Sequence, residues 1–221
     1  MFENFSAAML ELFATSLWET VLMVGISGLA GALFGVPLGV LLRLTDHGGV
    51  LQNRAVNGVM GAIVNAARST PFIILLVAII PFTRFIVGSS IGTAAAIVPL
   101  TLAAIPFVAR LVETALREVD AGLIEAAQAM GATTWQIVLK VLLPEALPGI
   151  VAGLTIMLVS LTGYSAMAGA IGGGGLGDLG IRYGYQRFLP DVMLAVVIVL
   201  IVFVQIVQSL GDWAVRKLSH K

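Results

Sequence analysis

Glu125–Gly149 reads EAAQAMGATTWQIVLKVLLPEALPG, a stretch rich in small residues in the middle of a chain that is otherwise apolar. Asp120 has the short oxygen-bearing side chain typical of a helix N-cap, and Gly131 can adopt the left-handed conformation that ends many helices. The pattern therefore predicts a short helix between them, over residues 121–130. Its expected apolar face consists of Leu123, Ala126, Ala127 and Met130. A short helix with an exposed apolar face is typical of a docking element for another protein.

A second helix is predicted directly downstream, where Thr133 or Thr134 can serve as its N-cap. Pro144 and Pro148 punctuate this helix, because proline lacks the backbone N–H that an uninterrupted helix requires. The segment of about 120–145 is therefore expected to be an ordered helical pair.

The composition places the chain among membrane proteins. Of its 221 residues 59% are hydrophobic and 11% are charged, and the mean hydropathy is +1.04. A soluble domain of this length needs far more surface charge. The formal net charge is zero, which argues against a nucleic-acid partner, and the absence of cysteine excludes disulfides and thiolate metal sites. His47 and His220 stand alone in the sequence, so we expect no metal site.

Several apolar stretches reach the roughly 20 residues that a helix needs to cross the hydrocarbon of a bilayer. These stretches are about Trp18–Leu42, Val56–Ile80, Ile91–Leu111, Leu147–Ile171 and Val192–Ala214. The sequence therefore predicts an all-α polytopic membrane protein with five transmembrane helices, folded as a single domain over residues 1–221.

Basic residues predict the orientation, because cytoplasmic loops carry an excess of Lys and Arg. One side would hold Arg43, Arg54, Arg117, Lys140, Arg216, Lys217 and Lys221. The other side would hold Arg84, Arg182 and Arg187. We therefore expect the N-terminus outside and the C-terminus in the cytoplasm. Segment 120–145 would then lie at the cytoplasmic surface, where Arg110, Glu113 and Arg117 are spaced for ion pairs along an extension of the third helix.

Two glycine and aromatic patterns mark the first part of the chain. Gly25, Gly28, Gly31 and Gly35 are three or four residues apart, which predicts a packing face on the first span. Upstream, apolar residues recur at helical spacing at Phe2, Phe5, Met9, Leu12, Phe13 and Leu17. This segment is either an interfacial helix on the outer surface or an extension of the first span. It contains no Lys or Arg, so a cleavable signal peptide is not expected.

The central stretch resembles a known motif. Glu125-Ala126-Ala127, three residues, Gly131, nine residues and then Val141-Leu142-Leu143-Pro144 are similar to the EAA motif of bacterial ABC importer permeases, which usually has isoleucine where this chain has Val141. The segments RSTPFIILLVAIIPFTRFIVGSSIG, AAIVPLTLAAIPFVARLVE, KVLLPEALPG and GYSAMAGAIGGGGLG extend the resemblance to the methionine importer permeases across nearly the whole chain.

The resemblance implies a type I ABC importer permease fold in the bacterial inner membrane, with a cytoplasmic coupling helix. It implies that two copies of the chain assemble with two ATP-binding subunits, and that a lipid-anchored binding protein delivers methionine. Glu125, Ala126, Ala127 and Gly131 would then form the interface with the ATPase subunit, which would bind the ATP and Mg²⁺. One set of five spans also offers too little wall for an enclosed path, which independently favours a symmetric pair.

No nucleotide site is predicted in this chain, so we expect no enzymatic activity. The glycine cluster Gly172–Gly177 lacks the Lys-Ser/Thr of a phosphate-binding loop, and Asp178 follows it. It is interpreted as a close-packed turn, or as a contact for the binding protein.

Polar residues within the spans are the candidates for the translocation path. Arg68 lies about midway along the second span and could bind a substrate carboxylate, or hold a kink at Pro71 through backbone carbonyls, with Ser69 beside it. The fourth span offers Tyr164, Ser165 and Met167; Met167 is either a flexible gate on a thin helix or ordinary packing.

Three classes of function were weighed. An ATP-driven importer permease fits the motif, for methionine or for another small amino acid or related solute. An intramembrane hydrolase would need a nucleophile and a base, and the spans hold no histidine or paired aspartates. An ion-driven carrier or channel usually has acidic residues in a span or an inverted repeat, and neither is evident.

Overall fold

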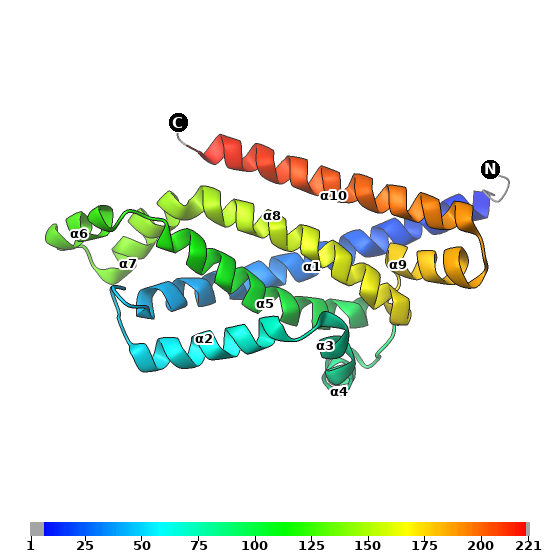
Figure 1. Ribbon diagram of the computed structural model, residues 1–221, viewed down its shortest axis with the longest axis horizontal. Helices are drawn as coiled ribbons and strands as arrows, with labels where there is room; N and C mark the ends of the chain where they lie inside the picture. Colours follow the sequence, from blue (N-terminus) through cyan, green and yellow to red (C-terminus); the bar gives the residue numbers. More distant parts are fainter. Residues whose placement is uncertain (1–6, 220–221) are drawn as a thin grey trace.

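The computed structural model describes residues 7–219, which form a helical bundle with no strand in that range (Figure 1). The first helix, α1 (Ala7–Thr45), is continuous over 39 residues. At ~1.5 Å per residue it is about 58 Å long, well beyond the ~30 Å of bilayer hydrocarbon. The predicted interfacial helix is therefore an extension of the first span over its described part, and Phe2 and Phe5 lie outside the described residues. Met9, Leu12, Phe13 and Leu17 pack in the cluster around Leu176 and Leu179.

The tightest pairing joins α1 to α5 (Thr93–Arg117), which contains Pro99 and Pro106. Gly31 and Gly35 face α5 so closely that an added Cβ would lie 2.5 Å from the Ala104 Cβ and 2.6 Å from the Val108 Cβ, respectively. Small residues permit this approach where lipid offers no hydrophobic driving force between helices. The predicted glycine face is thus confirmed for these positions, while a Cβ on Gly25 would meet nothing.

The second predicted span is broken. It consists of α2 (Arg54–Ser69) and α3 (Phe72–Ala78), which are bent by 100° at Thr70 and Pro71. Pro71 disfavours helical geometry in the residue before it, and Thr70 is extended with φ −75° and ψ 122°. A further short helix, α4 (Ile80–Val87), leads back to α5. The kink expected at Pro71 is thus a sharp break, and the pair together meets the length and hydropathy of the span predicted over about Val56–Ile80.

The central stretch forms α6 (Ala121–Ala129) and α7 (Thr134–Ile137). From α7 the chain continues through the wide π-type turn η1 (Val138–Leu142) into α8 (Leu143–Ala168), so the helical path runs without interruption from Thr134 to Ala168. It ends in a kink at Ile171 and Gly172, whose backbone angles are not helical. Pro144 lies in the first turn of α8, where the missing N–H is tolerated, and this position matches the widened turn before it. The predicted second helix is therefore continuous with the fourth span.

After α8 come η2 (Gly169–Gly173), α9 (Gly175–Leu179), η3 (Gly180–Gln186) and α10 (Pro190–Leu218). Helix α10 runs along the bundle's flank, with Val192 and Val196 as its buried residues (Figure 1). The N-terminal part of α1 lies at the same end of the bundle as α9, and the C-terminal end of α10 lies at the end that carries α6 (Figure 1). We call these two the α9 end and the α6 end.

Within residues 7–219, four helical segments are long and apolar enough to cross a membrane, and the bent pair α2–α3 makes a fifth crossing if it is counted as one span. The start of α1 and the end of α10 lie at opposite ends of the bundle (Figure 1).

Candidate functional site

Helix α6 is bounded by local signals. The Asp120 carboxylate accepts a hydrogen bond of 2.7 Å from the Gly122 N–H, as expected of an N-cap. At the other end Gly131 has φ +78°, and the Ala132 N–H donates to the Ala127 carbonyl at 3.0 Å. The left-handed conformation at Gly131 is the one that glycine adopts without steric cost, so both predicted boundaries are confirmed.

The exposed face of α6 differs from the predicted one by one residue. Met130 is 82% exposed and Leu123 45%, and Glu125 and Ala126 are exposed beside them. Ala127 is only 5% exposed, because its side chain packs into the main core of its own chain. Placing Ala127 on the exposed face was therefore wrong: its methyl group docks α6 onto the bundle.

Helix α7 continues this surface. Thr133 and Gln136 form a reciprocal capping box, with the Gln136 N–H donating to the Thr133 hydroxyl and the Thr133 N–H donating to the Gln136 side chain. Trp135 is 69% exposed and Leu139 47%. We call the residues Leu123, Glu125, Ala126, Met130, Trp135 and Leu139 the α6 surface. Its large apolar side chains stay exposed in the single chain, a feature typical of surfaces that contact another protein.

A network of ion pairs connects α5 with neighbouring segments at this end of the bundle. Glu113 is 1% exposed and lies 2.5 Å from Arg110 and 2.6 Å from Arg117, which confirms the predicted ion pairs. Arg117 also contacts Asp46 at 2.9 Å, and Arg110 donates to Asn65 of α2 at 2.7 Å. The network therefore ties α5 to the end of α1 and to α2.

Within this network the pKa of Asp46 lies below its ordinary value of 3.8. Burial alone would raise it, but the hydrogen bond from the His47 backbone and the positive charge of Arg117 outweigh that effect. The carboxylate is thus held in its charged form.

A recess of about 210 Å³ opens beside the break in the second span, lined by Arg68, Thr70, Phe72, Leu75, Ala103, Phe107 and Tyr164. Helices α2, α3, α5 and α8 each contribute to it. Phe72 and Tyr164 are stacked, with ring centroids 4.7 Å apart, and the Arg68 guanidinium lies 5.9 Å from the Phe107 ring.

The two other polar path candidates are placed elsewhere. The Ser69 hydroxyl donates to the Asn65 carbonyl at 2.8 Å, and Thr70 donates likewise to Ala66 at 3.1 Å, so both compensate the backbone break at Pro71. Ser165 is 1% exposed and donates to the Thr162 carbonyl, which buries it away from the recess. The structure therefore brings Arg68 and Tyr164 together, and leaves Ser69 and Ser165 out.

Met167 lies one turn beyond Tyr164 on α8 and is 38% exposed. Gly163 and Ala170 are exposed on the same side of the helix. This face has small side chains on both sides of one long flexible side chain, as the gate hypothesis requires.

At the α9 end the glycine cluster surrounds a carboxylate that the sequence analysis did not single out. The Gly175 N–H donates to the Glu19 carboxylate at 2.6 Å, and the Leu176 N–H donates to the Thr20 hydroxyl at 2.9 Å. Gly174 and Gly175 have φ near +79° and +75°, which lets the backbone turn its N–H groups toward α1. The cluster is therefore a close-packed turn. Glu19 lies within the first predicted span, so the expectation that the spans hold no acidic residue was wrong there, and this acidic residue in an apolar run was the signal that could have revealed the contact.

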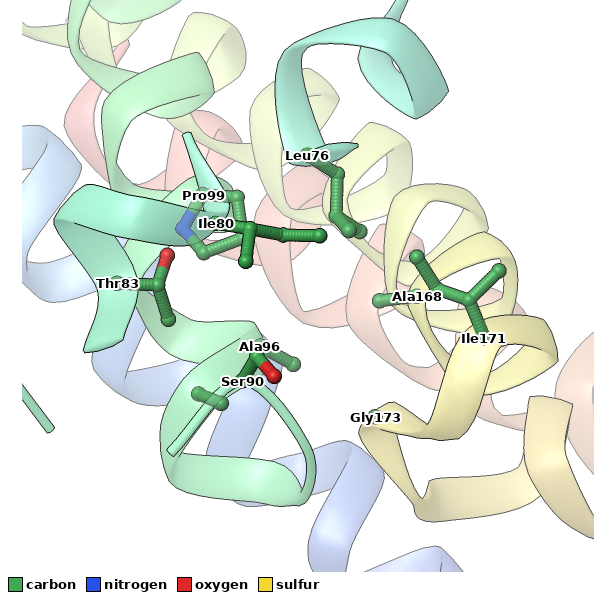
Figure 2. A pocket seen from close by; sticks show the side chains of 10 residues that line it. Leu76, Ile80, Thr83, Ser90, Ala96, Pro99, Ala168, Ile171 and Gly173 are labelled. Carbon is green, nitrogen blue, oxygen red and sulfur yellow. The ribbon is translucent and has the colours of Figure 1, made fainter. Parts of the chain in front are cut away.

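Figure 2 shows where the same end meets the broken span. Leu76, Ile80 and Thr83 face Ala168 and Ile171 across a cavity of about 20 Å³, which has room for a single water molecule. Pro99 borders this cavity and cannot donate to the Ala95 carbonyl, so one helix acceptor is freed there. Helices α3 and α4 thus pack against the end of α8 with almost no free volume.

Taken together, the fold and these sites define an all-helical, multi-spanning membrane protein with an exposed apolar surface at one end and a polar recess inside the bundle. The profile of the family described as "Binding-protein-dependent transport system inner membrane component" matches residues 35–220. The chain belongs to this family, and the predicted class of importer permease is confirmed.

Individual relatives agree. A protein of Vibrio cholerae serotype O1, described as a probable D-methionine transport system permease protein MetI, is 57% identical over 211 residues, which cover 96% of this chain and 94% of the relative. The protein of the same description from Haemophilus influenzae is 52% identical over 208 residues, covering 94% and 98%. The D-methionine transport system permease protein MetI of Escherichia coli K12 is 57% identical over 164 residues, covering 74% and 76%.

Solved structures agree as well. A chain of the MetNI methionine ABC transporter in an inward-facing conformation superposes with a TM-score of 0.96 at 53% identity, covering 98% of this chain and 100% of that chain. A chain of an amino acid ABC transporter solved with histidines has a TM-score of 0.78 at 20% identity over 95% of both chains, and shows that the fold is shared.

Proposed function

We propose that this chain is the permease subunit of an ATP-driven importer for methionine. The names of the relatives that are more than half identical support the substrate. The observation that carries the mechanism is the α6 surface, an exposed apolar face on a helix that has a cap at each end and is packed onto the bundle through Ala127.

In this proposal the α6 surface binds a separate ATPase subunit, which holds the ATP and Mg²⁺, so that the permease itself carries out no hydrolysis. The α6 end faces the cytoplasm, with Arg43, Arg117, Arg216 and Lys217 on that side. The N-terminus and the α9 end then face outward, where a binding protein delivers the substrate.

Two copies of the chain form the path in this proposal. The exposed face of α8, with Tyr164 and Met167, lines it from each copy. Movement of the ATPase subunits acts on α6 and is carried along the helical path that runs without interruption from Thr134 to Ala168. Because α7 continues directly into α8, a displacement at Thr134 also displaces the part of α8 that carries Met167.

Reconstitution tests the function. The permease, co-purified with its ATPase subunit and placed in liposomes with the binding protein, is expected to accumulate labelled methionine when ATP is supplied. Unlabelled amino acids serve as competitors and rank the alternatives. Accumulation of another amino acid with no uptake of methionine would replace the substrate, and uptake without ATP would overturn the mechanism.

A further inference from the structure

The recess beside Arg68 contains a cation without an anionic partner. Among the described residues, the Arg68 guanidinium takes part in no ion pair, and its recorded interaction is with the face of the Phe107 ring. Arg68 is exposed in the single chain, on the last turn of a helix that belongs to a membrane span. A charge at this depth is costly unless it serves a water-filled path or an anion.

Arg68 does not hold the kink at Pro71. Binding to backbone carbonyls at the kink was one of the two roles that the sequence left open for this residue. The side-chain bonds at the break come instead from Ser69 and Thr70, which donate to the carbonyls of Asn65 and Ala66. The guanidinium is therefore available to a ligand, with all of its N–H donors free of recorded hydrogen bonds in the described chain.

The surroundings of Arg68 define the ligand. Apolar and aromatic walls from Phe72, Phe107 and Tyr164 line this recess of about 210 Å³. A recess of this volume suits a ligand of the size of one free amino acid. The polar groups are one guanidinium, the Tyr164 hydroxyl and the Thr70 oxygen, which keeps a lone pair after donating to Ala66.

We propose that the recess is a binding site for the α-carboxylate of one free amino acid with an uncharged side chain. Arg68 pairs with the carboxylate, the Tyr164 hydroxyl donates to it, and the Thr70 oxygen and ring faces receive the ammonium group. The side chain lies against Leu75, Ala103 and the aromatic walls. No carboxylate lines the recess within residues 7–219, so a cationic side chain finds no partner there. The inference deepens the proposed function and rests on it.

The absence of cysteine from the chain gives a direct assay. A Thr70→Cys variant carries one thiol at the recess, and its labelling by a charged methanethiosulfonate reagent is followed on the permease subunit within the assembled complex with the ATPase subunit. Millimolar L-methionine is expected to slow labelling at least threefold. L-methioninol, which lacks the carboxylate, and L-lysine, which adds a cation, are expected to leave the rate unchanged.

A second substitution isolates Arg68. Arg68→Gln in the Thr70→Cys background is expected to weaken the apparent affinity for methionine about tenfold or more, the effect of one lost charge-assisted hydrogen bond. Arg84→Gln is the matched control, because Arg84 is exposed on α4 and bonded to Ser90. Ala103→Cys repeats the assay from α5 if the first cysteine prevents assembly.

Three results would contradict the proposed binding site. The first is equal labelling with and without methionine in every nucleotide state. The others are protection by methionine that persists in the Arg68→Gln variant, and protection by methioninol equal to that by methionine. Uptake by the wild-type complex in the same preparation separates this failure from that of the proposed function. If methionine is transported but does not protect the thiol, only the proposed binding site is contradicted. If methionine is not transported at all, the proposed function is contradicted.

Discussion

The two ends of α8 are built in opposite ways. At the α6 end the chain leaves large apolar side chains uncovered, with Met130 82% and Trp135 69% exposed. At the α9 end, helix α9 buries its leucines, with Leu176 at 0% and Leu179 at 1% exposed, although Tyr185 and Phe188 beyond it stay exposed. The α6 end is stabilised by local caps such as Asp120 and Thr133, whereas the α9 end is held by a hydrogen bond between Glu19 and Gly175, 156 residues apart.

This difference separates two roles. An end that is ordered by its own caps but left uncovered is prepared to receive a partner, because its shape does not depend on the partner's presence. Helix α9, by contrast, has its leucines buried and its first backbone N–H groups bonded within the chain, so it does not depend on a partner for its order. It can move as one piece with α1 and α8.

The largest expected effect on transport comes from placing a bulky side chain on the α6 surface. Ala126→Trp is expected to reduce ATP-driven uptake to background, because a bulky side chain on the exposed face blocks docking of the ATPase subunit. The thermal stability of the permease should not change. Ala126→Ser, which keeps the side chain small, should transport normally. Wild-type transport by Ala126→Trp in an assembled complex would remove the coupling role of this face.

The buried neighbour of Ala126 gives the opposite signature. Ala127→Trp forces a large side chain into a packed core and is expected to cost about 1–3 kcal/mol of stability. Its primary defect is therefore a lower melting temperature of the purified permease. Loss of transport at unchanged stability would place Ala127 on the partner surface, as the sequence alone suggested.

At the α9 end, Glu19→Ala should destabilise the permease by about 1.5–3 kcal/mol, because the N–H of Gly175 loses a charged acceptor. The melting temperature in detergent measures this loss. Glu11→Ala, an exposed acidic residue on the same helix, is the control and should have little effect. Equal effects of the two substitutions would show that the glycine turn does not depend on Glu19.

A smaller and purely functional effect is expected at Met167. Met167→Ala should raise ATP-independent leak several-fold without loss of stability, since the side chain is 38% exposed. Met157→Ala on the same helix is the contrast: this residue is 1% exposed, so its loss should cost about 2–5 kcal/mol without leak. Labelling of Met167→Cys from outside should vary with nucleotide. Normal coupling in Met167→Ala, together with constant labelling, would identify Met167 as packing.

The smallest effect concerns Asp46. Its pKa is lowered in the folded protein, so the carboxylate contributes stability above pH 3.8 that is lost as the pH falls through the lower folded value. Asp46→Asn should cost less than about 1 kcal/mol at neutral pH, because Arg117 is half exposed. The difference from wild type should shrink below pH 3.8 and in high salt. A pH-independent difference would assign the effect to packing.

The sequence was sufficient wherever the determining contacts are local. Asp120, Thr133 and Gly131 act on their own backbone within a few residues, and Arg110, Glu113 and Arg117 are neighbours on one helix. The family resemblance also rests on a short contiguous motif. All of these predictions were confirmed.

The sequence was insufficient where distant segments decide. Pro71 indicated a kink, but the 100° bend depends on how α3 packs against α5 and α8. The orientation of Ala127 depends on the core that α6 meets, and the role of Glu19 depends on a glycine turn at the far end of the chain. Ser165 resembled a path residue until its hydroxyl was seen to bond within its own helix.

The glycine face of α1 also constrains the order of biogenesis. The Ser27 hydroxyl donates to the Ile97 carbonyl 70 residues later, alongside the glycines that seat α5. At roughly 5–20 residues per second, a ribosome needs about 4–14 s to make the intervening chain. For that interval α1 has no permanent neighbour on its glycine side, while α2, α3 and α4 are synthesised first. Until α5 is synthesised, α1 therefore resides in the insertion machinery or in lipid. Packing of α5 onto the glycine face of α1 is then the step that fixes the final arrangement of the bundle.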